Sequence, residues 1–286
     1  MADYANAARR FVMATPAYLR LRDVLVRAHR NNVHVTREDL ARRYLTGSGI
    51  EIGALTTPLR VPPDVRVRYV DRKSRAGLLE EEGPELRAKG LNPDAIPETD
   101  VVDDAGTLAN FGESEVDFVV ANHVLEHLED PIAGLRNLLR VTRPGGIVLL
   151  TLPDARHTFD ARRQRTSPEH LVRDHQEGPE ASRRAHYEEW ARIIEGLPDD
   201  RIDERADEFA REDARHHFHV WELDDFLELL RAVPLGGELV EARAYGIEFA
   251  VVLRKTSPPS PSDSTTGQPC TRAASLGSQL SKRSSS

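Results

Sequence analysis

Two acidic residues stand 20 positions apart, each in a short apolar run. Glu51 lies in the segment GIEIGA, just before Gly53, and Asp71 closes the segment VRVRYVD. A strand that ends in a glycine-containing turn presents backbone N–H groups to a ligand, and a carboxylate at the end of the next strand can accept hydrogen bonds from both hydroxyls of a ribose. The pair therefore predicts a nucleoside-binding edge, although many α/β proteins carry an acid at a strand end without that role.

Further polar residues follow the next apolar runs. Asp104-Ala105 comes after the third run, and Asn122-His123 comes directly after the fourth. The carboxylate of Asp104 can accept a hydrogen bond from the exocyclic amine of adenine. We predict that Asp104 and Ala105 hold the base, and that Asn122 and His123 lie near the reacting atoms.

Histidines are the candidate proton acceptors, because imidazole titrates near neutral pH. His123 stands directly beyond a predicted strand end, and His157 comes three residues after another, so these two are the predicted catalytic residues. His127 lies at the start of an amphipathic helix, where packing or capping is the more frequent role. A further group can simply line a cap; it comprises His216, His217 and His219.

The charged segment after Pro153 also raises the question of a metal. Its candidate ligands are His157, Asp160, His170, Asp174, His175 and His186. His170 and His175 are five residues apart, which is not one face of a helix, and the set has no spacing typical of a metal site. We predict solvated surface and no metal here, with a metal site as the alternative.

Strand patterns alternate with helical ones, which implies βαβ units and a parallel sheet. The predicted strands cover residues 49–54, 65–70, 99–102, 116–121 and 147–152, and two more at 238–244 and 248–253 suit an antiparallel hairpin. Helices are predicted before the sheet (one starting at Thr36), near Pro58 after the first strand, and over 131–141, 180–197 and 222–233.

Composition excludes several classes of protein. The one cysteine, Cys270, allows no disulfide within the chain, which favours a reducing cytoplasm. A net charge of −8 without a basic stripe argues against a nucleic-acid partner. No run of about 18 apolar residues occurs, so we expect no membrane partner. Residues 256–286 are rich in Ser, Thr and Pro, and we expect a disordered tail there.

The stretch DFVVANHVLEHLEDPIAGLRNLLRVTRPGGIVLLTLPD, residues 117–154, resembles one half of the class I S-adenosylmethionine (SAM)-dependent methyltransferases, in their small-molecule, UbiE-like branch. Outside an insertion, the resemblance extends over residues 47–255. It implies an α/β, Rossmann-like class I methyltransferase fold: a seven-stranded, mostly parallel sheet with an antiparallel last strand, plus N-terminal helices and a helical cap insertion.

The resemblance also assigns roles to the residues introduced above, with SAM as the cofactor. It places Glu51, Gly53 and Ala54 at the methionine moiety, where the glutamate either orders the loop or reaches the amino group. Asp71 then binds the ribose, and Asp104 with the backbone of Ala105 binds adenine. Asn122 and His123 lie near the sulfonium.

One motif departs from the family. Its usual acid-x-Gly-x-Gly-x-Gly reads Glu51-Ile-Gly53-Ala-Leu55-Thr-Thr57 here, so one glycine of three remains. The β-carbons of Leu55 and Thr57 would crowd a close cofactor approach or a positive φ angle. We expect a loop with a wider path; the alternative is a methyltransferase-fold scaffold protein without activity. A nicotinamide-dependent enzyme is a third hypothesis. The Arg-Val-x-x-Pro-Gly-Gly segment argues against it.

These observations predict methyl transfer from SAM to a small-molecule acceptor, with an oxygen of a sugar or secondary metabolite as the first expectation. The reaction is an in-line displacement that depends on orientation, with a histidine base as a further aid. If the histidine-rich segment binds a metal, the expected function is that of a metal-assisted sugar methyltransferase. We expect an N-terminal helical lid (1–46) and a cap insertion (155–218) to form the acceptor pocket on the methyltransferase domain (47–255), and we leave a homodimer open.

Overall fold

Seven strands form one mixed sheet in the computed structural model, which describes residues 36–256. Their order is β3-β2-β1-β4-β5-β7-β6. Strands β1 to β5 pair in parallel, whereas β7 runs antiparallel to both β5 and β6. The strands are β1 (Ser48–Ile52), β2 (Arg66–Asp71), β3 (Val101–Val102), β4 (Val116–Asn122), β5 (Thr142–Pro153), β6 (Gly237–Tyr245) and β7 (Glu248–Lys255). This topology confirms the predicted fold class.

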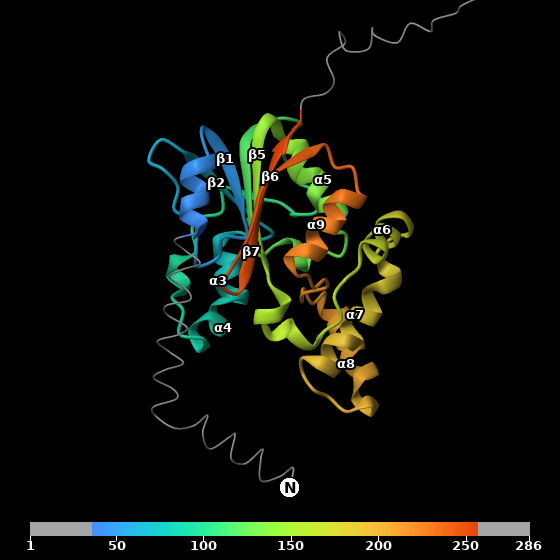
Figure 1. The fold of residues 1–286 in the computed structure, drawn as a ribbon. Helices are drawn as coiled ribbons and strands as arrows, with labels where there is room; N and C mark the ends of the chain where they lie inside the picture. The colour runs from blue at the N-terminus through green and yellow to red at the C-terminus, as the bar shows by residue number, and fades with distance from the viewer. Residues whose placement is uncertain (1–35, 257–286) are drawn as a thin grey trace, which may run out of the picture. The chain divides into compact units, whose positions relative to one another are not determined.

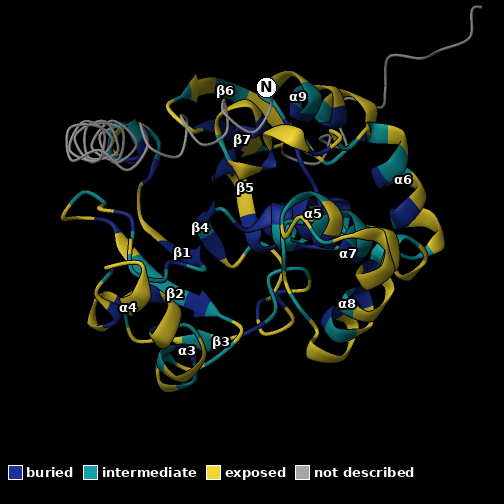
Figure 2. Ribbon diagram, turned by 90° about the horizontal axis from the view of Figure 1, so that it is seen from below, coloured by how far each residue is buried: buried dark blue, intermediate teal, exposed yellow. Residues whose placement is uncertain are grey.

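Helices cover both faces of this sheet (Figure 1). Because side chains alternate along a strand, Val119 and Ala121 of β4 join one apolar cluster while Phe118 and Val120 join another. The first cluster includes residues of α5 (Pro131–Val141) and α9 (Leu223–Ala232). The second includes residues of the helix that covers residues 36–44. Figure 2 shows the central strands as the most buried part.

The connection from β1 to β2 contradicts one expectation, because no helix opens near Pro58. Pro58, Pro62 and Pro63 lack backbone N–H groups, and the N–H of Leu59 is given to the side chain of Glu51. Two short helices instead follow β2, namely α3 (Arg75–Glu81) and α4 (Gly83–Ala88). Short 3-10 helices cover Pro93–Ala95 and Leu125–His127.

The segment predicted as a cap insertion is helical. Two 3-10 turns at Ala155–His157 and Phe159–Arg162 lead to α6 (Pro168–Glu177), α7 (Glu180–Ile193) and α8 (Asp199–Glu212), of which only α7 was predicted. Tyr187 of α7 and Phe209 of α8 belong to a separate apolar cluster of this segment. The insertion therefore has a small core of its own.

The two ends of the chain lie outside this description. Residues 1–35 of the predicted lid and residues 257–286 of the predicted disordered tail are outside the described residues. Within 36–256, no helix combines the length and the apolarity that crossing a membrane requires.

Candidate active site

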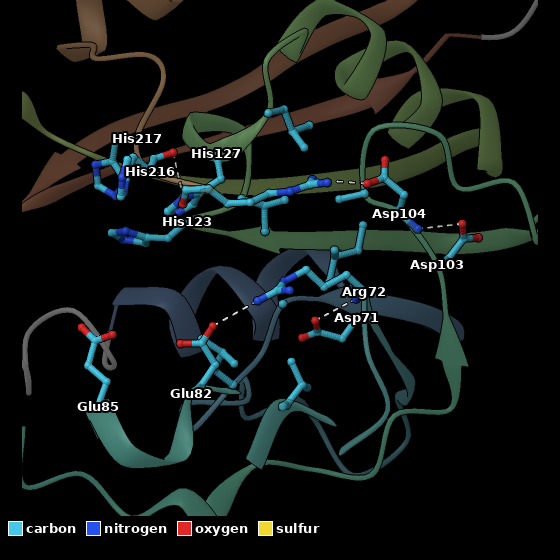
Figure 3. A pocket seen from close by; sticks show the side chains of 18 of the residues that line it. Asp71, Arg72, Glu82, Glu85, Asp103, Asp104, His123, His127, His216 and His217 are labelled. Atoms are coloured by element: carbon cyan, nitrogen blue, oxygen red, sulfur yellow. Dashed lines mark hydrogen bonds and ion pairs between the residues drawn. The ribbon is translucent and has the colours of Figure 1, made fainter. Parts of the chain in front are cut away.

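A cavity of about 520 Å³ opens at the carboxyl ends of the parallel strands, where ligands bind in open α/β sheets. Five of the predicted site residues line it: Gly53, Asp71, Asp104, Ala105 and His123. The carboxylates of Asp71, Asp103 and Asp104 lie toward one end, and His123, His127, His216 and His217 gather at the other (Figure 3).

Asp71 closes β2 and points its carboxylate at this cavity. Its Oδ1 accepts the backbone N–H of Arg72 at 2.8 Å, which orients the group. The guanidinium of Arg72 does not pair with Asp71; it forms ion pairs with Glu81 and Glu82. Burial raises the pKa of Asp71 above its ordinary value. An acceptor held this way suits the hydroxyls of a ribose.

Asp103 and Asp104, the two acids after β3, have different partners. Asp103 accepts three backbone N–H groups, from Asp104 at 2.8 Å, Ala109 at 3.1 Å and Asn110 at 2.8 Å, and so fixes the loop. Asp104 is partly exposed, accepts the N–H of Gly106 at 2.9 Å, and pairs at 3.5 Å with Arg215 from the insertion. Sequence reasoning missed the supporting role of Asp103, although the doubled acid after the strand is its signal.

Three predicted cofactor residues do not line the cavity, namely Glu51, Ala54 and Asn122. Both carboxylate oxygens of Glu51 lie 3.0 Å from the N–H of Leu59, and Asn122 donates to it at 3.3 Å. Burial raises the pKa of Glu51 to about 7. Of the two roles considered for this glutamate, the geometry favours ordering of the loop behind the cavity wall.

The loop after β1 keeps the backbone of a glycine-rich turn. Gly53 has φ +66, and Leu55, at the position of the second glycine, has φ +43. The Leu55 side chain lines the cavity and packs against the apolar cluster of Leu78 on α3. The predicted conflict between a β-carbon and a positive φ is therefore present at Leu55, whereas Thr57 has no positive φ.

His123 is enclosed by two buried carboxylates. Its Nε2 lies 2.7 Å from Glu248, and its Nδ1 lies 3.4 Å from Glu126. Burial alone would lower the pKa of His123, but Glu126 and Glu248 raise it to about 9. An imidazolium has no free lone pair, so this environment argues against the predicted role of His123 as a base. Its φ of +55 places the ring between these acids.

His157, the other predicted base, lies in an exposed 3-10 turn and does not line the cavity. The histidines that do line it beside His123 are His127, His216 and His217. Trp190 stacks on His216 with ring centroids 4.2 Å apart. Burial lowers the pKa of His127 and lowers that of His216 to about 4. The sequence assigned these residues to packing or to lining a cap.

Comparison with known proteins gives the family. Residues 47–233 match the model of a methyltransferase domain. The chain belongs to this methyltransferase family. It is an enzyme that takes its methyl group from SAM, and its strand order agrees with that assignment. The nicotinamide and scaffold hypotheses are therefore set aside.

The solved structures that resemble this chain share little sequence with it. A SAM-dependent methyltransferase from Aquifex aeolicus is 11% identical, with 74% of this chain and 82% of that chain covered at a TM-score of 0.39. A SAM-dependent methyltransferase from Thermotoga maritima, described as a possible histamine N-methyltransferase, is 13% identical, with 84% and 97% covered at a TM-score of 0.42. Among curated protein sequences, none matches the chain.

Proposed function

We propose that this methyltransferase transfers the SAM methyl group to an oxygen of a small molecule, such as a sugar or a secondary metabolite, as members of the UbiE-like branch act on small molecules. The observation that carries the proposal is the division of one cavity into an acidic end, with Asp71 and Asp104, and an end built by histidines and aromatic residues of the insertion.

The acidic end suits SAM. In our assignment Gly53 faces the methionine moiety, Asp71 holds the ribose, and Asp104 with Ala105 holds adenine. The methyl group then lies toward His123 and the other histidines. The C–O bond forms as the C–S bond breaks in line, so the main task of the site is to hold the acceptor oxygen about 3 Å from the methyl carbon and to exclude water.

The other end suits an acceptor with a ring. Phe159 is 55% exposed although it lines the cavity, and it meets Trp190 edge-on with ring centroids 5.7 Å apart. Exposed aromatic faces beside polar groups are typical of sites that bind planar or sugar rings. We therefore assign acceptor binding to the cap insertion (155–218) together with the N-terminal segment predicted as a lid (1–46), of which residues 1–35 lie outside the described residues.

Replacement of Asp71 tests the cofactor assignment. Asp71→Asn removes the charge from the ribose acceptor, and a charge-assisted hydrogen bond contributes about 1.5–3 kcal/mol, so the affinity for S-adenosylhomocysteine should fall about 10- to 100-fold. Titration calorimetry measures this. Asp64→Asn removes one exposed carboxylate that does not line the cavity and should leave the affinity unchanged. Equal affinities of the two variants would contradict the site as drawn.

A further inference from the structure

Three potential metal ligands meet where the insertion joins the sheet. One ligand atom from each of Glu126, His127 and His217 lies within 4.8 Å of the others. Glu126 and His127 belong to the 3-10 turn after β4, and His217 comes from the end of the insertion. The two segments are held together because the backbone N–H of Phe218 donates to the carbonyl of Glu126 at 2.7 Å. His127 and His217 line the cavity, and Glu126 is buried behind them.

Hydrogen bonds orient both imidazoles. The Nδ1 of His127 lies 2.9 Å from the carbonyl oxygen of Arg215. The Nδ1 of His217 lies 2.7 Å from a carboxylate oxygen of Asp160. A carbonyl and a carboxylate only accept, so each Nδ1 carries a proton, and the tautomer that binds a metal is the one with its lone pair on Nε2. Metal-binding histidines typically donate their other N–H to a carbonyl or a carboxylate in this way.

The support behind His217 is itself buried and paired. Asp160 is 2% exposed and accepts from Arg163 at 3.0 Å through its other oxygen. Arg163 also donates to the carbonyl of His217 at 2.7 Å and to Glu189 of α7 at 2.8 Å. This network fixes the direction of one ring that lines the cavity.

Glu126 supplies a negative charge to the cluster, and its buried carboxylate lacks hydrogen-bond donors within residues 36–256. Its side chain is 1% exposed, yet neither carboxylate oxygen has a hydrogen-bond donor among the described residues. Its one close cation in the described part of the chain is His123, whose Nδ1 forms an ion pair with it at 3.4 Å and offsets part of its charge, but the contact does not meet the geometry of a hydrogen bond. A buried carboxylate without donors is costly, and a metal ion is one of the groups that can satisfy it.

We propose that Glu126, His127 and His217 bind a divalent transition-metal ion, with Zn²⁺ as the ion that two imidazoles and a carboxylate suit, and that its open positions face the cavity. Zn–N bonds of 2.0–2.1 Å place tetrahedral ligand atoms about 3.4 Å apart, so small side-chain movements close the site. The role given to the ion rests on the proposed function: it holds the acceptor hydroxyl and acidifies it. The hydroxyl proton leaves to solvent, the oxygen takes the methyl group, and S-adenosylhomocysteine departs with the C–S electron pair.

A second histidine cluster provides the control. His170, His186 and His219 also gather within 4.8 Å. The prediction of solvated surface is wrong for two of the acids it covered, because Asp160 and Asp174 are each 2% exposed, and His219 is 1% exposed. Here, however, Arg173 donates to the Nδ1 of His170 at 2.9 Å. That bond places the proton of the neutral ring on Nε2, which already lies 3.0 Å from Asp174. The tautomer needed for a ligand is therefore disfavoured in this cluster.

Zinc titration of the full chain tests the proposal. The protein is stripped with a chelator and titrated with Zn²⁺ against a chromogenic competitor, and we expect one tight site per chain. Glu126→Gln and His217→Ala should each weaken it by at least 100-fold, because each removes a ligand. Asp160→Asn leaves the three ligands in place but weakens the support of His217 and the pair with Arg163, and it should weaken zinc binding about 10-fold. His170→Ala should leave it unchanged.

Two results would overturn the site: no saturable uptake near one Zn²⁺ per chain, or uptake that His170→Ala abolishes and His217→Ala spares. Binding of S-adenosylhomocysteine by each variant shows that it is folded. That binding also separates the two proposals, since zinc uptake without any S-adenosylhomocysteine binding would leave the metal site standing and the cofactor assignment refuted.

Discussion

Glu51 carries a carboxyl group that the fold buries, and the charge of Arg37 offsets only a small part of the cost of that burial. Its partners are the backbone N–H of Leu59 and the amide of Asn122. Those two donors offset only part of the desolvation of a charged carboxylate, which is why the pKa of Glu51 rises to about 7. At the residue scale, Glu51 therefore orders the loop after β1, and its carboxyl group has a pKa above the ordinary value of a glutamate.

This raised pKa predicts a pH-dependent stability. The folded protein binds the Glu51 proton more tightly than the unfolded chain does, so the stability that this proton provides is complete below about pH 4.5 and is lost as the pH rises toward 7. A rise of the pKa from 4.5 to about 7 corresponds to about 3 kcal/mol. Glu51→Gln should remove that loss, so its stability relative to the parent should increase between pH 5 and 8 in urea denaturation.

An exposed glutamate gives the control for this experiment. Glu113→Gln removes the same charge from the surface, and subtraction of its pH profile leaves the part that belongs to the buried site. A difference between the Glu51→Gln variant and the parent that does not change with pH would show that the carboxyl group titrates normally.

At the scale of elements, sequence predicts best where local signals agree. Helix α5 has the predicted bounds because Pro131 occupies its first turn and the side chain of Asp130 caps it by accepting the N–H of Ala133 at 2.9 Å. The absence of a helix near Pro58 has two causes: Pro62 and Pro63, which the sequence shows, and a buried hydrogen bond from Leu59 to a side chain eight residues earlier, which it does not. Helices α6 and α8 were missed because their charged composition hides a short apolar stripe.

The loop between β1 and β2 supplies the element-scale prediction. Leu55 holds φ +43, which costs a β-branched residue more than a residue whose β-carbon is unbranched. Leu55→Val should therefore destabilise the protein by about 1–2 kcal/mol more than Leu79→Val, which makes the same change in the same apolar cluster within α3. Urea denaturation of both variants measures the excess. Similar losses would mean that the left-handed backbone at Leu55 carries no strain.

At the scale of the whole domain, the site depends on contacts between segments distant in sequence. Asp71 could be placed from sequence because it ends a strand at the edge where ligands bind. His123 could be placed for the same reason, but its partner Glu248 lies 125 residues later, so its charge could not be foreseen. The pairing of His127 with His217 depends likewise on how the insertion folds back, which the sequence does not show. Sequence reasoning therefore favoured His157, which is exposed and does not line the cavity.

The buried pair of Arg37 and Glu248 joins the helix over residues 36–44 to the strand end that holds His123. Arg37 is 8% exposed, and its removal leaves a buried carboxylate with one partner fewer, so Arg37→Met should lower the free energy of unfolding by about 2–4 kcal/mol. Arg43→Met in the same helix breaks a surface pair with Glu241 and should cost less than about 1 kcal/mol. Urea denaturation compares the two variants. If both losses are small, apolar contacts such as those of Leu40 hold this helix to the sheet, and the ion pair adds little.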